Sequence, residues 1–247
     1  MRPAVRLMNG NLGGSVKALV FDVFGTVVDW RGSIIREAEA LARSKGLSFD
    51  AARLADDWRA GYQPAMQRVR SGELPWTRID DLHRLILDGL LEKHGLAGLG
   101  AAERAEFNRV WHRLDPWPDA VAGLTRLKRR FIIGTLSNGN VGLLVNMAKR
   151  AGLPWDVVLS AELAHHYKPD PEAYRMPPDL LGLERAQVML VAAHPNDLAA
   201  AAKQGLRTGY VPRPLEHGPG RKPHDTAGNS FDVTAADFNA LAERLGA

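Results

Sequence analysis

The feature that most constrains the fold is a buried-strand pattern that ends abruptly at an acid. Residues 16–21 are apolar apart from Lys17, and the run stops at Asp22, after which Gly25 and Thr26 turn the chain. A carboxylate at the carboxyl end of a buried strand lies where open α/β sheets bind their ligands. Neither strand packing nor an ordinary surface position explains Asp22, so it is the first candidate for a functional residue.

Four further strands are predicted. Residues 131–136, 188–191 and 208–211 are mainly apolar runs that follow helical segments and end in polar or turn residues, and residues 156–159 form a shorter candidate. Strands that alternate with helices imply right-handed βαβ units and a parallel sheet covered on both faces. We therefore predict an α/β fold built on a Rossmann-like, doubly wound parallel sheet.

A long helical insert is predicted directly after the first strand. Residues 31–114 show helical periodicity without a convincing strand, and prolines at Pro116 and Pro118 then end the helical region. We expect residues 15–30 and 115–247 to form the core domain and residues 31–114 to form an all-helical cap over the carboxyl edge of the sheet. The segment 212–229, rich in proline, glycine and histidine, is expected to be a long surface loop.

Composition excludes several classes of protein. Cysteine is absent, so there is no disulfide framework, thiolate metal site or cysteine nucleophile. No apolar stretch approaches membrane-spanning length, and residues 1–15 lack the apolar segment of a secretory signal, so we expect a loose N-terminal extension and a cytoplasmic protein. The net charge of +4 is spread along the chain, which suits a small anionic substrate better than a nucleic acid.

Four short motifs, in a fixed order, resemble those of the haloacid dehalogenase superfamily. They are Asp-Val-Phe-Gly-Thr at 22–26, Leu-Ser-Asn-Gly at 136–139, Lys168 within His-Tyr-Lys-Pro-Asp-Pro-Glu, and Asp197 after a late strand. The resemblance covers nearly the whole chain. It implies the same core fold and cap that the strand and helix patterns predict.

Phe24 indicates which family within this superfamily the sequence resembles. Phosphatases of this superfamily carry a second Asp two residues after the nucleophile, where it protonates the leaving group, whereas Phe24 cannot donate a proton. The sequence is similar to the type II 2-haloacid dehalogenases, which keep an aromatic residue there. The resemblance implies hydrolysis of short 2-haloalkanoic acids to 2-hydroxy acids and halide, through an ester on Asp22 and without a cofactor or metal.

The resemblance also implies catalytic roles for Lys168, Asp197 and Thr26. Lys168 would be the counter-charge that keeps Asp22 ionised, although a solvated surface lysine is the simpler alternative. Asp197 would orient Lys168 and polarise water, or it could serve only as an acid at a helix N-terminus. The Thr26 hydroxyl could contact Asp22 or cap the following segment.

Residues for substrate and halide binding follow from the same resemblance. Ser137 and Asn138 would contact the substrate carboxylate or the halide, unless they only cap the turn at the strand end. Tyr174 would close the site around the substrate, with plain packing as the alternative.

An arginine of the insert would stabilise the departing halide. Arg59 has the best matching context, with Trp58 and Tyr62 as apolar walls; Arg53 is the second candidate, and a solvated helix face is the alternative for both.

The segment before Asp197 departs from the family pattern. Many members carry Ser and Asn there, whereas this chain has Ala192 and His194. His194 could act as the base or orienter of the hydrolytic water, or be structural, and Asn196 is a further polar neighbour.

Two other functions remain possible from the sequence alone. Asp22 and Asp197 could hold Mg²⁺ in a phosphohydrolase or phosphonate hydrolase, against which Phe24 argues. A non-catalytic binding domain would have no need for a buried nucleophile. The expected partners are a small 2-haloacid carboxylate and its halide, without nucleic acid or membrane, and a second copy of the chain in a homodimer.

Overall fold

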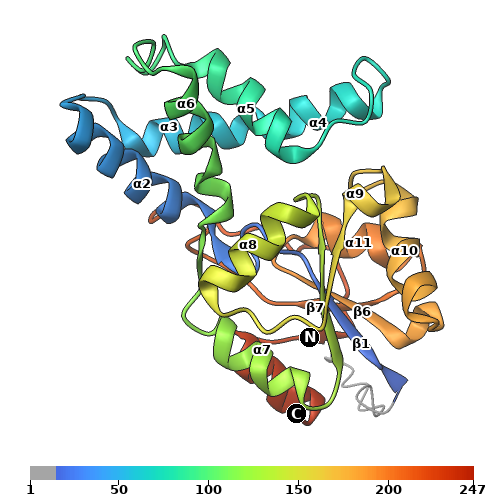
Figure 1. Cartoon of the computed structure of the whole chain (residues 1–247). Coiled ribbons are helices and arrows are strands. Elements are labelled where there is room, and N and C mark those ends of the chain that lie inside the picture. The colour runs from blue at the N-terminus through green and yellow to red at the C-terminus, as the bar shows by residue number, and fades with distance from the viewer. Residues whose placement is uncertain (1–14) are drawn as a thin grey trace.

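The computed structural model describes residues 15–247, and its centre is a six-stranded sheet in which every strand pair is parallel (Figure 1). From one edge to the other the strands are β5 (Val157–Ser160), β4 (Ile132–Ser137), β1 (Ala18–Phe21), β6 (Val188–Ala192), β7 (Arg207–Tyr210) and β8 (Val233–Thr234). The predicted fold class is confirmed, and all five predicted strands are present. The N-terminal extension expected before residue 15 lies outside the described residues.

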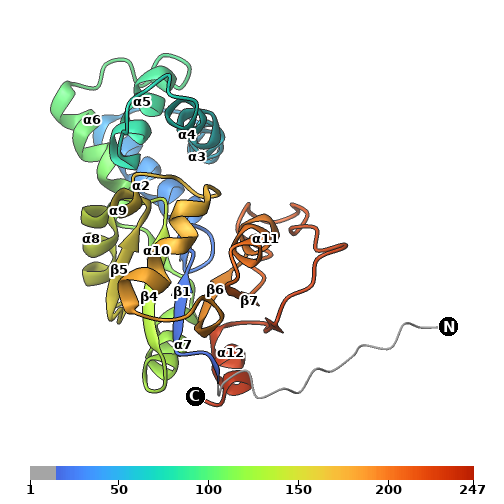
Figure 2. The ribbon, with the colours of Figure 1, turned by 90° about the vertical axis from the view of Figure 1, so that its right-hand side faces the viewer.

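Helices cover both faces of the sheet (Figures 1 and 2). Leu19 and Phe21 of β1 belong to one apolar cluster, whereas Ala18 and Val20 belong to another, because successive side chains of a strand point to opposite faces. The first cluster includes side chains of α7 (Ala120–Lys128), α8 (Val141–Ala151) and α12 (Phe238–Leu245); the second includes those of α10 (Pro171–Leu181) and α11 (Pro195–Lys203). A strand buried on both sides reads as a continuous apolar run, which is why β1 was recognisable.

A short antiparallel ribbon connects the sheet to a group of helices. Its strands are β2 (Val28–Asp29) and β3 (Asp115–Pro116), which are too short to give a pattern in the sequence. Between them run α2 (Trp30–Lys45), α3 (Ala51–Ala60), α4 (Tyr62–Arg70), α5 (Ile79–Leu90), α6 (Ala101–Asn108) and the 3-10 helix η1 (Arg109–His112). Figures 1 and 2 show these helices stacked beyond the end of the sheet at which the chain leaves β1.

Local signals position the first of these helices. The Asp29 carboxylate accepts a hydrogen bond from the Gly32 backbone N–H at 2.9 Å and so caps the start of α2. Gly46 ends the helix with φ of 63°, a left-handed conformation that glycine adopts at low cost.

The remaining elements are α9 (Ala161–Ala164) and the 3-10 helix η2 (Arg185–Gln187). Within residues 15–247, no helix is long and apolar enough to cross a membrane.

Candidate active site

The candidate site lies where three neighbouring strands end. β1 pairs with β4 on one side and β6 on the other, all in parallel, so the residues that follow them meet at one edge of the sheet. Asp22 follows β1 directly, Asn138 follows β4, and His194 stands two residues after β6. The chain connections explain why motifs far apart in the sequence converge here.

A buried lysine joins two carboxylates. Lys168 Nζ lies 2.9 Å from Asp22 Oδ1 and 2.6 Å from Asp197 Oδ2. Lys168 is 8% exposed, so it is not the solvated surface lysine of the simpler alternative. Asp197 comes from the first turn of α11, and the ammonium therefore bridges the carboxyl end of β1 to the start of that helix.

This pairing keeps Asp22 ionised. Burial would raise the pKa of Asp22, but the charge of Lys168 and the hydrogen bond from His194 outweigh it and lower that pKa far below its usual value. Burial would lower the pKa of Lys168, and the charges of Asp197 and Asp22 raise it instead. Each charge is thus stabilised by the other, which leaves a carboxylate ready to act as a nucleophile in a dry environment.

Two hydroxyl groups hold the carboxylates in place. Thr26 Oγ1 donates to Asp22 Oδ2 at 2.7 Å and accepts from the Ala193 backbone N–H at 2.9 Å, which ties the turn after β1 to the end of β6. The Tyr174 hydroxyl donates to Asp197 Oδ1 at 2.7 Å, and Tyr174 is fully buried. In the described structure Tyr174 therefore orients Asp197.

The residues after β4 support the lysine. Asn138 Oδ1 accepts from the backbone N–H of Lys168 at 2.8 Å, while its amide nitrogen lies 3.3 Å from the sulfur of Met66 on α4. Ser137 Oγ accepts from the Gly139 backbone N–H at 3.1 Å and is buried, which is the turn-capping contact expected as its alternative. Asn196 is exposed on the first turn of α11.

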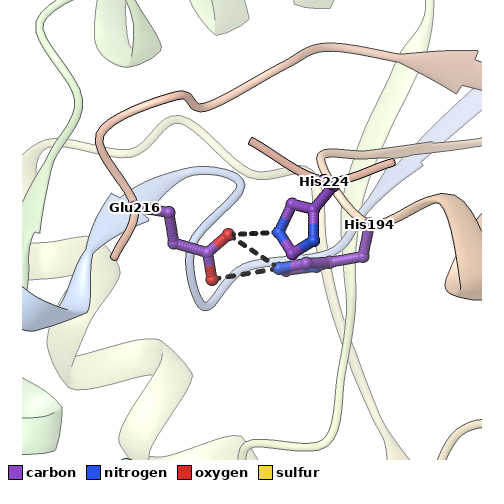
Figure 3. A group of neighbouring side chains, drawn as sticks. All are labelled: His194, Glu216 and His224. Atoms are coloured by element: carbon purple, nitrogen blue, oxygen red, sulfur yellow. Dashed lines mark hydrogen bonds and ion pairs between the residues drawn. The ribbon is translucent and has the colours of Figure 1, made fainter. Parts of the chain in front are cut away.

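His194 belongs to a cluster that the sequence did not predict (Figure 3). Its Nδ1 lies 2.9 Å from Asp22 Oδ2, and its Nε2 lies 3.0 Å from both carboxylate oxygens of Glu216. His224 Nε2 is also 3.0 Å from Glu216 Oε2. Glu216 and His224 come from the loop expected only to cover the surface, yet Glu216 is 1% exposed. We call His194 and Glu216 the dyad.

The dyad carries opposite charges in the free protein. Burial would lower the pKa of His194, but its contacts with Asp22 and Glu216 raise it to about 10. Burial would raise the pKa of Glu216, and the hydrogen bonds from His194 and His224 lower it well below its usual value. At neutral pH the imidazolium of His194 therefore stands between two carboxylates.

Gly25 makes room for the dyad. Its φ of +86° lies in the left-handed region, and a Cβ added there would overlap the Glu216 carboxylate. The Trp30 indole N–H donates to Glu216 Oε1 at 3.2 Å from the start of α2. The turn after the nucleophile and the first residue of the helical insert thus both shape the position of Glu216.

Aromatic side chains of the insert pack on Phe24. The Phe24 ring makes edge-to-face contacts with Tyr62, His83 and Trp111 at centroid distances of 6.3, 6.2 and 5.7 Å. His83 is fully buried, burial lowers its pKa, and neither ring nitrogen has a hydrogen-bond partner within residues 15–247. His83 could not be predicted from the sequence, because a lone histidine in a helical pattern indicates no particular role.

Arg59 rather than Arg53 reaches this region. The Arg59 guanidinium lies 4.4 Å from the Tyr62 ring centroid and 5.3 Å from that of Trp30, and its Nη1 is buried without a hydrogen-bond partner among the described residues. Arg53 is exposed on α3. A cavity of about 440 Å³ beside Arg59 is also lined by Arg221, Lys222 and His217, and Asp56, Trp30 and Ala60 complete its walls.

Comparisons with known proteins identify the family of this chain. A family model for haloacid dehalogenase-like hydrolases matches residues 16–205. The (S)-2-haloacid dehalogenase 4A of Burkholderia cepacia is 31% identical over 212 residues, which cover 81% of this chain and 84% of that protein. The (S)-2-haloacid dehalogenase of Xanthobacter autotrophicus is 29% identical over 210 residues, covering 80% and 76%.

The structural resemblance is closer still. The crystal structure of a defluorinating L-2-haloacid dehalogenase has a TM-score of 0.90 at 46% identity, covering 94% of this chain and 96% of that one. The chain belongs to the haloacid dehalogenase-like hydrolases.

Proposed function

We propose that this protein hydrolyses 2-haloalkanoic acids to 2-hydroxy acids and halide, through an ester on Asp22. The observation that carries the proposal is an ionised, buried Asp22 paired with Lys168, beside Phe24 where a proton donor would be needed for a phosphate or alcohol leaving group. A halide ion leaves without a proton. The names of the relatives support the same substrate class.

In the first step an Asp22 oxygen attacks the halogen-bearing carbon. The new C–O bond forms as the carbon–halogen bond breaks, and its electron pair leaves with the halide. Arg59, whose buried Nη1 has no hydrogen-bond partner among the described residues, is the group we assign to stabilise that developing charge. Phe24 and the aromatic residues around it would exclude water from this step.

In the second step the ester is hydrolysed, and we assign His194 as the base. Esterification removes the negative charge of Asp22, one of the two anions that raise the pKa of His194, so the imidazolium becomes easier to deprotonate at that stage. Glu216 keeps a proton on Nε2 and leaves Nδ1, next to Asp22, free to take a proton from water. Once Nδ1 has lost its proton to solvent, it takes a proton from the attacking water, whose oxygen adds to the ester carbonyl carbon. The bond between that carbon and the substrate oxygen then breaks, the proton on His194 passes to the substrate oxygen, and the 2-hydroxy acid leaves. The second proton of the water is released and the Asp22 carboxylate is restored.

The magnesium phosphohydrolase alternative has less support. Both oxygens of Asp22 and both oxygens of Asp197 accept hydrogen bonds from protein groups, and Lys168 occupies the position between the two carboxylates. An ammonium in that position repels a second cation.

We also infer a homodimer that works in the cytoplasm, and residues 31–114 acting as a cap over a core of residues 15–30 and 115–247; native mass measurement and limited proteolysis would check these points.

The test is halide release from 2-chloropropionate in the presence of a chelator. Wild-type protein should release chloride with turnover, and Asp22→Asn should release none. Reaction in ¹⁸O-water under single-turnover conditions should place the label on Asp22, which mass spectrometry of the peptide detects. Hydrolysis of a phosphate ester with magnesium, without any halide release, would refute the proposal.

A further inference from the structure

His194, Glu216 and His224 form a group of ligand atoms that can hold a metal ion. Their nitrogen and oxygen atoms all lie within 4.8 Å of one another, and Figure 3 shows both imidazoles directed at the same carboxylate. A zinc ion binds histidine nitrogen and carboxylate oxygen at about 2.0–2.2 Å, which places its ligands roughly 3.3 Å apart. The two Nε2–Oε2 distances, each 3.0 Å, need only a slight expansion to reach that geometry.

The charge around Glu216 favours an exchangeable cation. Glu216 is 1% exposed, and within residues 15–247 every ion-pair partner of this carboxylate is a histidine: His194, His224 and, at 3.9 Å, His217. Among the described residues no lysine or arginine forms an ion pair with it, although the charge of Arg59 also helps to lower its pKa. A buried carboxylate whose ion-pair partners are imidazoles can be satisfied by protons on those rings or by a divalent ion in their place.

Outer contacts of the kind that orient metal ligands are already present. His194 Nδ1 contacts Asp22 Oδ2 at 2.9 Å, and the Trp30 indole N–H donates to Glu216 Oε1. Metal-bound histidines usually donate their second N–H to a carboxylate in this way, which fixes the ring and the tautomer. The His224 side chain is 29% exposed, so the group can be reached from solvent.

We propose that His194, Glu216 and His224 bind a zinc ion, and that the bound ion inhibits ester hydrolysis. Two imidazoles and one carboxylate favour zinc over magnesium or calcium, which prefer oxygen ligands. Zinc on Nε2 of His194 confines the remaining ring proton to Nδ1, where it is donated to Asp22. His194 then has no free nitrogen to take a proton from water. The inhibition rests on the proposed function, whereas the binding does not.

Binding is tested with zinc sulfate added to chelator-treated, desalted protein and measured by calorimetry. One zinc ion per chain should bind, and His224→Gln should weaken the affinity at least about 10-fold. His166→Gln, at an exposed histidine on another part of the surface, is the matched control and should bind like wild type. Equal binding by wild type and His224→Gln, or none by wild type, would overturn the site.

Two further measurements test the proposal without relying on the His224→Gln variant. Cobalt(II) bound to the wild-type protein should give the strong visible bands of a four- or five-coordinate nitrogen–oxygen site; the weak spectrum of hydrated cobalt would also overturn the proposal. With 2-chloropropionate, zinc should allow one chloride per chain and then stop turnover, leaving labelled ester on Asp22. Zinc that binds without affecting an active enzyme would refute the inhibition alone, and an enzyme without dehalogenase activity would refute the proposed function while leaving the binding result intact.

Discussion

Replacing Glu216 with glutamine tests how the dyad acts. The raised pKa of His194, about 10 against an ordinary 6.5, corresponds to about 5 kcal/mol in favour of the imidazolium. Burial of the ring opposes this shift, so the carboxylates of Asp22 and Glu216 together contribute more than the net value of about 5 kcal/mol, and an equal division gives each more than about 2 kcal/mol. Glu216→Gln should therefore lower the pKa of His194 to about 8 or below in the free enzyme, which histidine NMR titration measures.

The same substitution should slow ester hydrolysis. Glutamine can donate its amide N–H to Nε2, and the ring proton then moves to Nδ1, which is the nitrogen needed as the base. Loss of a correctly oriented base reduces a rate by about 10²- to 10⁴-fold. Rapid-mixing measurements should show a burst of about one chloride per chain followed by slow turnover, because attack by Asp22 does not require Glu216.

The matched control is Asp232→Asn, which likewise exchanges a carboxylate for an amide, at a half-buried position. Asp232 contacts Arg207 and Thr208 at the start of β7, outside the candidate site. Asp232→Asn should show neither the burst nor the slow turnover that is expected of Glu216→Gln. Wild-type turnover by Glu216→Gln, or an unchanged His194 pKa, would refute the assignment of the dyad.

Three further outcomes are expected. Lys168→Met leaves Asp22 as a buried carboxylate without its ammonium, so the unfolding free energy in urea should fall by about 3–5 kcal/mol and halide release should be lost; a change below about 1 kcal/mol would contradict the pairing. Gly25→Ala should cost about 1–2 kcal/mol for its positive φ and also slow ester hydrolysis, because the added Cβ overlaps the dyad carboxylate. Gly46→Ala, at a positive φ with open space around it, should show only the stability cost. The pKa of His194 is raised in the folded state, so the contribution of its imidazolium to stability is complete below pH 6.5 and is lost as the pH rises through about 10. The difference in unfolding free energy between wild type and His194→Gln should therefore shrink by about 3 kcal/mol between pH 7 and pH 10.

The sheet was predictable because its strands are buried on both faces. β1 and β6 are the two middle strands of the sheet, and β4 is the next strand beside β1. Their sequences are therefore nearly continuous apolar runs that end at polar residues. β2, β3 and β8 have two residues each, and such short segments carry no periodicity. Their pairing is decided by the position of the elements they connect.

The candidate site was predictable where strand order alone brings residues together. Asp22, Asn138 and His194 follow the adjacent parallel strands β1, β4 and β6. Asp197 lies in the first turn of α11, the helix after β6, and Lys168 lies shortly before α10. Glu216 and His224 lie in a loop whose proline and glycine content indicates only an exposed connection. A loop's path depends on tertiary contacts, here the space above Gly25 and the indole of Trp30, and neither is visible in local sequence. The histidines in that loop were the one available signal.

The indole of Trp30 has a consequence for how variants of this enzyme would behave. One edge of the ring donates to Glu216, while the Arg59 guanidinium lies over the ring at 5.3 Å. A single side chain thus contacts both the arginine that we assign to the leaving group and the carboxylate that we assign to the orientation of the base. On these assignments, reshaping Trp30 for a larger or smaller halogen would also disturb ester hydrolysis, so the two steps could not be tuned independently through this position.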